Sequence, residues 1–432
     1  MPDSRPTSGA PHPEAPAEAI RPAIALNVPL LADIALIAAI VISLAVTLWW
    51  LVAIARMWHT RRVLGVCSDG LALPDDPRRV AVFVPAHNEQ AVIAALVDSL
   101  KAQDHPACRF ILALDRCTDA TRSVATERIA GDPRFVVHEI ASCPEGWAGK
   151  VHALHDAVQR HAQDADLLLF ADADTTLHPS CIRAASALVA ARGLGMLSLL
   201  STLTFDQSFE RSMQAPAVFE LMRRYPPVLA SRDRDRRPFA NGQFMLWTHD
   251  AYRLVGGHAA FRSELLEDIA MARAAWRAGL RVQVLPAGAM LSCRMYPDEP
   301  AFRRGWQRIF TESANRKTRR LESWALAAVV RGTVVPLVLL ATLICGVVLA
   351  LSDQPRAWAA SGAAAIAIVA WAAGVWMFLA NASVPSRRRI VAVLYWPLGS
   401  VAIGHVLRTA ARALRSGQAT TWGGRSYDRP AR

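Results

Sequence analysis

The 432-residue sequence predicts an α/β protein with a mainly parallel sheet, one N-terminal membrane segment and two to three C-terminal ones. Apolar residues make up 53% of the chain, but they concentrate near its two ends. Between them, from about Arg79 to Arg320, short β-rich runs alternate with helical patterns, which favours a parallel sheet with its site at the strand C-termini. The length allows two to three domains, and the periodic patterns exclude a wholly disordered protein.

The N-terminal part predicts a disordered segment followed by a membrane anchor. Residues 1–24 are rich in Pro, Ala and Glu and have no periodicity. The run Leu31–Ile54, within an anchor placed at residues 29–55, is long enough to cross a bilayer and too long for a signal peptide. Arg56, Arg61 and Arg62 follow it, so this end is expected to face the cytoplasm.

The central segment, residues 63–320, is expected to form the catalytic domain. Each expected strand is a short apolar run that ends in polar residues and is usually followed by helical sequence. The four clearest runs are Val80–Pro85, Phe110–Leu114, Phe135–Glu139 and Leu167–Ala171.

The block 333–407 holds three further apolar runs, Thr333–Leu351, Ala357–Ala380 and Ile390–Leu407. The first two are joined by the short linker Ser352–Arg356 and predict a membrane hairpin. The third is short and contains Pro397. A full crossing would place the basic tail, residues 408–432, outside the cell, whereas a re-entrant or interfacial segment keeps it in the cytoplasm, and we favour the second.

The net charge of +12 is concentrated beside the apolar segments, as is typical of cytoplasmic juxtamembrane sequence. The sequence has no nucleic-acid-binding module and no basic face with stacking aromatics, so no nucleic-acid partner is expected. The seven cysteines include no CxxC pair, which indicates reduced thiols rather than a disulfide framework or a zinc site.

Two polar turns follow the first two expected strands. Val84–Glu89 can hold a nucleotide, or can be a loop in which Asn88 caps a helix. In the second turn Asp115 can accept hydrogen bonds from a base or ribose, while Asp119 is expected to cap the next helix. The chain has no GxGxxG or Walker A motif, which disfavours a dinucleotide or P-loop site.

Asp172 and Asp174 directly follow a strongly apolar strand. Carboxylates in this place suit Mg²⁺ or Mn²⁺, which take oxygen ligands and keep positions open for substrate phosphates. The alternative is an Asx turn at the strand end, and we favour the metal.

Three further groups leave both a functional and a structural interpretation open. Asp268 can be a general base, or Glu267 and Asp268 can merely stabilise a helix N-terminus. Lys150, beside a glycine turn, can meet a phosphate or be solvated. A third segment can line an acceptor pocket or form a simple turn: Asn241, Gly242 and Gln243.

Together, and in this order, these motifs resemble the family 2 glycosyltransferases, which have the Rossmann-like GT-A fold, over about residues 79–310. Other segments look like the membrane-anchored branch that acts on lipids, including carotenoid and hopanoid-associated glycosyltransferases: Gly146–Lys150, Gly256–His258, Cys293–Tyr296, Gly305–Trp306 and Thr421–Tyr427.

The resemblance implies a role for each matching position. The nucleotide-sugar donor would be bound by Pro85, Asn88, Glu89, Asp115, Lys150 and Asp172. Asp172 and Asp174 would hold Mg²⁺ or Mn²⁺, and Asp268 would deprotonate the acceptor in an inverting displacement. The acceptor side would comprise Asn241, Gly242, Gln243, Glu267, Trp306, Trp422 and Arg425.

Two departures from the family pattern matter. Leu114 replaces the first Asp of the second turn, which weakens the expectation of base recognition there. Gly305 replaces the Arg that precedes the Trp in the motif of processive synthases, which favours transfer of a single sugar. Trp306 itself can close over the acceptor or anchor the domain at the membrane surface.

The expected protein is therefore an integral cell-membrane glycosyltransferase whose cytoplasmic domain passes a sugar, from a UDP-linked donor by preference, to a lipid hydroxyl or carboxyl. The alternatives are a processive polysaccharide synthase and a catalytically inactive membrane scaffold. No motif in the sequence names the sugar, the lipid or the oligomeric state.

Overall fold

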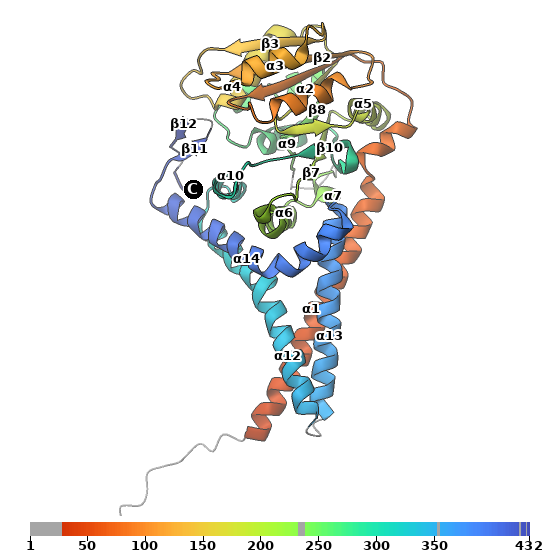
Figure 1. Ribbon diagram of the computed structural model, residues 1–432, viewed down its shortest axis with the longest axis vertical. Coiled ribbons are helices and arrows are strands. Elements are labelled where there is room, and N and C mark those ends of the chain that lie inside the picture. Colours follow the sequence, from red (N-terminus) through yellow and green to blue (C-terminus); the bar gives the residue numbers. More distant parts are fainter. Residues whose placement is uncertain (1–27, 232–237, 352–354, 423–424, 429) are drawn as a thin grey trace, which may run out of the picture.

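The computed structural model describes residues 28–231, 238–351, 355–422, 425–428 and 430–432. It has an α/β domain at one end, a layer of helices beneath it, and three long helices that extend away from that layer (Figure 1). The expected disordered segment 1–24, the basic stretch Arg232–Arg237 and most of the linker Ser352–Arg356 lie outside the described residues.

A seven-stranded sheet in the order β3-β2-β1-β4-β8-β6-β9 forms the centre of the α/β domain. All neighbouring pairs are parallel except that β8 runs antiparallel to β4 and β6. The strands are β1 (Val80–Ala86), β2 (Cys108–Asp115), β3 (Phe135–Ile140), β4 (Leu167–Ala171), β6 (Met196–Leu200), β8 (Phe244–Thr248) and β9 (Val282–Pro286). The four expected strands are thus confirmed to within two residues at each end.

Helices cover both faces of this sheet, which explains why its central strands are almost continuously apolar. Along β1 the side chains alternate, with Val82 and Val84 in one core and Ala81 and Phe83 in the other. The first core is closed by η1 (Cys67–Ala72), α2 (Ile93–Lys101), α3 (Thr121–Ile129) and α5 (Cys181–Arg192). The second is closed by α4 (Gly149–His161), α8 (His249–Leu254), η3 (His258–Phe261) and α9 (Glu267–Arg277).

A second, three-stranded sheet and a group of helices lie between the main sheet and the long helices (Figure 1). The sheet has the order β5-β10-β7. Its elements and the nearby helices are β5 (Thr175–Leu177), β7 (Thr202–Leu203), η2 (Glu210–Gln214), α6 (Ala215–Met222), α7 (Pro227–Ala230), η4 (Gly288–Met290), β10 (Leu291–Cys293) and α10 (Glu299–Ser313). Two of these strands begin or end beside the expected metal-binding carboxylates.

Four helices of the described chain are long and apolar enough to cross a membrane. The expected anchor is α1 (Val28–Leu64), which packs along α13 (Pro355–Asn381). The other long helix is continuous from α11 (Thr318–Val329) through the π-turn η5 (Val330–Val334) to α12 (Val335–Ala350). The residues between the expected catalytic domain, which ends at 320, and the expected membrane block, which begins at 333, therefore lie inside one helix.

The last apolar run forms most of α14 (Ser386–Arg415), a single helix with Pro397 inside it. Its length and composition would allow it to cross a membrane. In Figure 1, however, it is bent and lies across the base of the α/β domain, transverse to α12 and α13, as an interfacial segment would. It contains no re-entrant loop. Its buried side pairs with α10 and α11, whose side chains include Phe302, Trp306 and Leu321.

The first residues of the expected basic tail, 408–415, are helical, because α14 continues to Arg415. After it, β11 (Thr420–Trp422) and β12 (Arg425–Tyr427) form an antiparallel hairpin beside the α/β domain (Figure 1). None of the seven cysteines, all of which lie in the described part of the chain, forms a disulfide.

Candidate active site

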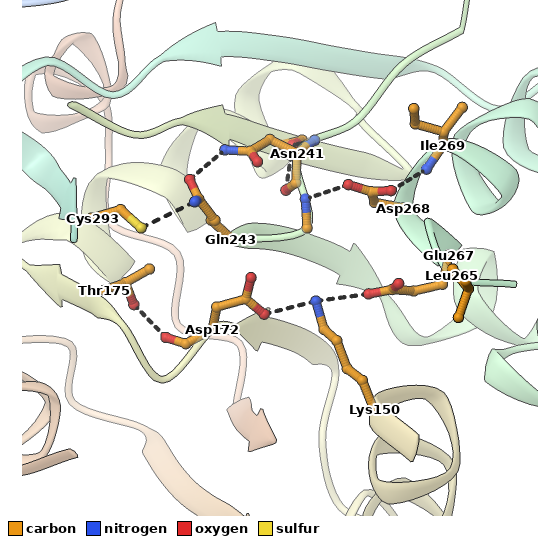
Figure 2. A network of polar contacts seen from close by, with 12 residues as sticks. Lys150, Asp172, Thr175, Asn241, Gln243, Leu265, Glu267, Asp268, Ile269 and Cys293 are labelled. Carbon is orange, nitrogen blue, oxygen red and sulfur yellow. Dashed lines mark hydrogen bonds and ion pairs between the residues drawn. The ribbon is translucent and has the colours of Figure 1, made fainter. Parts of the chain in front are cut away.

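The expected site residues meet at one edge of the main sheet. Asp172 follows the C-terminus of β4, which pairs Ala171 with Phe244 of β8. Because β8 is antiparallel, the residues before it, Asn241 to Gln243, lie at the same edge. The N-termini of α4 and α9 also point there and bring Lys150 and Glu267 to face Asp172 (Figure 2).

Lys150 bridges two carboxylates. Its Nζ lies 2.7 Å from an oxygen of Asp172 and 2.8 Å from an oxygen of Glu267 (Figure 2). Burial lowers the pKa of Lys150, but the two carboxylates outweigh it and the net pKa is raised, so the ammonium stays charged. Lys150 is therefore not the solvated side chain that one interpretation of the sequence allowed.

Asp268 is held by two main-chain N–H groups. Gly242 donates to Oδ2 at 2.8 Å and Ile269 donates to Oδ1 at 2.7 Å (Figure 2). Burial, with the nearby Glu267 charge, raises the pKa of Asp268 to about 7. A fixed carboxyl group that changes protonation near neutral pH has the properties of a general base.

Asp174 and Glu89 complete a concentration of acidic groups near Asp172. Burial and the Asp172 charge raise the pKa of Asp174 to about 8 and that of Glu89 to about 7. Oδ1 of Asp174 is buried and accepts no hydrogen bond. A buried carboxyl oxygen that has no hydrogen-bond partner, in a group that tends to keep its proton, is a suitable ligand for a cation. The cation would supply the missing partner.

The fit to Mg²⁺ or Mn²⁺ is therefore supported by Asp174 together with Asp172. Over the described part of the chain, no cluster of three or more His, Cys, Asp or Glu side chains is placed to hold a metal ion. Since Mg²⁺ is commonly held by one or two carboxylates plus water and substrate phosphates, this set still suits a metal that binds together with a diphosphate.

The segment before β8 forms a turn, in which the Phe244 N–H donates to the Asn241 carbonyl at 3.2 Å, and the turn is built into the site. Asn241 donates through Nδ2 to the carbonyl of Leu199 at 2.9 Å and to Oε1 of Gln243 at 3.1 Å. Gln243 in turn donates to Sγ of Cys293 at 3.0 Å (Figure 2). These contacts fix the loop whose Gly242 N–H holds the Asp268 carboxylate.

The first two strand-end turns are tied to each other. Asn88 does not cap α2: its Oδ1 accepts from the N–H of Thr118 at 2.8 Å, in the turn after β2. Asp119 accepts from the N–H of Thr121 at 3.0 Å and so stabilises the start of α3, as expected. Asp115 is bound through both oxygens by its neighbour Arg116, at 2.7 and 2.6 Å.

Trp306 is buried, with 2% of its surface exposed, and packs between Phe302 and Phe310 of α10. That position does not suit an anchor at a membrane surface. Its indole also lines the cavity described next. Trp422 and Arg425 lie in the terminal hairpin, but their side chains lie outside the described part of the structure.

A single cavity of about 1810 Å³ connects the site to the long helices. Its polar end is lined by the carboxylates and Lys150, and Pro85, Glu89 and Asp115 also border it. Its other end is lined by apolar side chains of α1, α6 and α13: Leu48, Trp49, Val52, Met57, Val218, Phe219, Met222 and Phe378. The cavity therefore joins charged and hydrocarbon-like surroundings.

The family model "Glycosyltransferase like family 2" matches residues 77–328, more than half of the chain. The chain belongs to glycosyltransferase family 2. The GT-A class expected from the motifs agrees with this family and with the mixed α/β sheet, and the chain is accordingly a glycosyltransferase.

Among curated proteins, this family 2 glycosyltransferase is 26% identical over 245 residues to the 4,4'-diaponeurosporenoate glycosyltransferase of Staphylococcus aureus strain MRSA252. The match covers 55% of this chain and 62% of the relative, so the chain spans under two thirds of the relative's length. The same enzyme of strain USA300 matches over the same shares.

Two solved structures show a weaker likeness. The mannosyltransferase PcManGT of Pyrobaculum calidifontis, in complex with GDP-Man and Mn²⁺, is 18% identical with a TM-score of 0.47, and the match covers 87% of this chain and 98% of that one. S. aureus TarS 1–349, in complex with UDP-GlcNAc, is 15% identical with a TM-score of 0.40, covering 81% and 96%.

Arg308 lines the cavity of this glycosyltransferase but was not selected from its sequence. Tyr296 and Tyr427 also line it, and they were named only within segments that look like the membrane-anchored branch. Arg308 lies two residues after Trp306, and its charge acts on Asp172. A Cβ on Gly305 would clash with the Tyr296 ring, so Gly305 makes room for that ring. One signal in the sequence could have pointed to Arg308. The Trp306 motif lacks the usual Arg before the Trp, and Arg308 lies two residues after it.

Proposed function

We propose that this protein is a membrane-bound glycosyltransferase that moves a single sugar from a nucleotide-diphosphate sugar, UDP-linked by preference, to a lipid acceptor. The observation that carries the proposal is the cavity that runs from Lys150, Asp172 and Asp268 to the apolar faces of α1, α6 and α13. A water-soluble acceptor gains nothing from such an apolar end, whereas a lipid chain buries its own surface there.

The donor belongs at the polar end. Lys150 and Arg308 are the cations that border this end near Asp172, and a diphosphate requires positive charge. A bound Mg²⁺ or Mn²⁺, held by Asp172 and Asp174, would neutralise the leaving diphosphate. Asp115 and Pro85 lie on the side where β1 and β2 end, which suits the nucleoside, although Asp115 must share its carboxylate with Arg116.

Asp268 is the general base of the proposed step. It takes the proton of an acceptor hydroxyl, the acceptor oxygen bonds to the sugar's anomeric carbon, and the bond from that carbon to the diphosphate breaks. The nucleoside diphosphate leaves with the bonding electrons, and the anomeric configuration inverts. An acceptor that is already a carboxylate needs no base, and Asp268 would then only orient it.

The acceptor is proposed to be a membrane lipid such as a carotenoid or hopanoid. The apolar end of the cavity supports this, and so does the 26% identity to enzymes named for an apolar carotenoid acid. Arg56 and Arg61 line the cavity near the end of α1, where they would sit at the cytoplasmic membrane surface. This placement supports the proposed orientation, in which the catalytic domain faces the cytoplasm.

The test uses membranes from cells that express the wild type, Asp172→Ala or Asp268→Ala. They receive a panel of radiolabelled nucleotide sugars with Mn²⁺ or Mg²⁺, and the lipids are then extracted. We expect label in the lipid fraction with the wild type alone, abolished by a chelator. Label in an insoluble polymer would instead establish a processive synthase. If no nucleotide sugar gives either sugar transfer or donor hydrolysis, the protein is an inactive scaffold.

A further inference from the structure

The C-terminal segment bridges two layers of the protein. At its end, the Arg432 N–H donates to the carbonyl of Arg316 at 3.0 Å and its guanidinium to Oδ1 of Asn315 at 2.9 Å. Arg316 also donates to the carbonyl of Pro430 at 3.5 Å. The tail thus starts at the end of α14, returns to the turn between α10 and α11, and touches the α/β domain in between.

Tyr427 makes that middle contact. Its ring packs against Ala148, Val151 and Leu265, and its hydroxyl accepts the N–H of Gly149 at 3.3 Å. It also lines the catalytic cavity. Hence a residue near the chain's end lies at the N-terminus of α4, one position from the cation Lys150.

The surroundings of Tyr427 belong to the donor end of the cavity. A Cβ on Gly149 would lie 3.0 Å from both Oδ2 of Asp115 and a guanidinium nitrogen of Arg116, so these groups adjoin the point that Tyr427 touches. The apolar end is lined by α1, α6 and α13 instead. In Figure 1 the β11–β12 hairpin lies on the opposite side of the molecule from the upper part of α1.

We propose that Tyr427 is a donor-binding residue and that the described residues beside it, 425–428, lie over the nucleotide, not the acceptor. This rests on the proposed function. The bond of 3.3 Å to Gly149 is long and therefore readily exchanged. A phosphate oxygen of the donor can accept a hydrogen bond from the Gly149 N–H, as anions do at helix N-termini. The Tyr427 hydroxyl is then free to donate a hydrogen bond to the ligand. Because Tyr427 also lines the cavity, a base bound there can stack on its ring, and such stacking tolerates any base.

The experiment measures binding of UDP and of GDP, each with Mn²⁺, to the full-length detergent-solubilised protein by titration calorimetry. Wild type is compared with Tyr427→Ala, Tyr427→Phe and Tyr395→Ala. Tyr395 lies on α14, is half exposed and does not line the cavity, so it controls for loss of a tyrosine from the C-terminal region. Melting temperatures of all variants show whether each is folded.

We expect Tyr427→Ala to weaken binding of the preferred nucleotide about tenfold or more, through loss of ring contact and hydroxyl. Tyr427→Phe should weaken nucleotide binding less, and Tyr395→Ala should leave it unchanged. Arg432→Ala, which frees the tail's end without touching the site, should weaken binding in the same direction. With acceptor lipid present, the acceptor KM should be unchanged by Tyr427→Ala.

Equal nucleotide binding by wild type and a folded Tyr427→Ala would overturn this inference and leave the proposed function standing. A rise in acceptor KM with unchanged nucleotide binding would overturn it as well, because the tail would then cover the acceptor. Wild type that binds neither nucleotide would overturn both the inference and the proposed function.

Discussion

The main-chain N–H of Gly242 points at Oδ2 of Asp268 from 2.8 Å, although the two residues are 26 positions apart. The loop before β8 and the first turn of α9 therefore meet at the carboxylate proposed as the base. A Cβ at Gly242 would lie 3.2 Å from that oxygen and 3.2 Å from Nζ of Lys150, tighter than ordinary van der Waals contact. Only a glycine leaves both groups where they are.

Gly242→Ala should therefore lower kcat by about ten- to a hundredfold, part of the contribution that a positioned general base makes. The KM for the donor should rise by a smaller factor, because the same Cβ also presses on Lys150, which is a proposed contact of the donor diphosphate. Steady-state kinetics of sugar transfer to extracted lipid measures both. Gly362→Ala is the matched control, because a Cβ there meets nothing within 4 Å. Equal kcat values for Gly242→Ala and Gly362→Ala would show that Gly242 does not position Asp268.

The pH dependence of transfer should report Asp268. Its pKa is raised to about 7, and a base acts only when deprotonated, so the rate should fall as the pH drops below about 7 and level off above it. Asp268→Asn should be inactive, while Asp268→Glu should keep an acidic limb at lower rate. A flat profile between pH 5 and 8 in an active wild type would show that Asp268 takes no proton from the acceptor.

Lys150→Met should destabilise the protein by about 3 kcal/mol, because it leaves the buried Glu267 carboxylate and the partly buried Asp172 carboxylate without their counter-ion. Thermal unfolding without metal measures this loss as a lower melting temperature. Lys317→Met, at an exposed position, is the control. Added Mn²⁺ should restore more stability to Lys150→Met than to the wild type, since the metal replaces the missing positive charge. An unchanged melting temperature for Lys150→Met would mean that Asp172 and Glu267 are already neutral without Lys150.

A bulky residue in the apolar end of the cavity should impair acceptor use alone. Val52 of α1 lines that end, so Val52→Trp should raise the acceptor KM several-fold while donor hydrolysis without acceptor stays at the wild-type rate. Val41→Trp, on the same helix but away from the cavity lining, should behave as wild type. Loss of donor hydrolysis in Val52→Trp would instead place the donor near α1.

Much of the fold was predictable because its signals are local. The apolar runs of β1, β2, β3 and β4 are continuous in the sequence, and their strands lie within two residues of the expected bounds. The long helices contain the expected apolar runs but extend well beyond them, as α1 does to Leu64. The antiparallel strand β8 was not foreseen, since the direction of a strand depends on its partners and not on its own composition. The path of α14 across the base of the domain likewise depends on packing against α10 and α11.

The sequence by itself determined that carboxylates follow buried strands, that apolar segments flank an α/β domain, and that the motifs occur in the order of a family. These are properties of short stretches, set by periodicity and residue type. Tertiary structure alone decided that Lys150 pairs with Asp172 and Glu267, that Gly242 holds Asp268, and that Tyr427 reaches Gly149. Such pairings join residues far apart along the chain, and only the packed sheet and its helices bring them within hydrogen-bond distance.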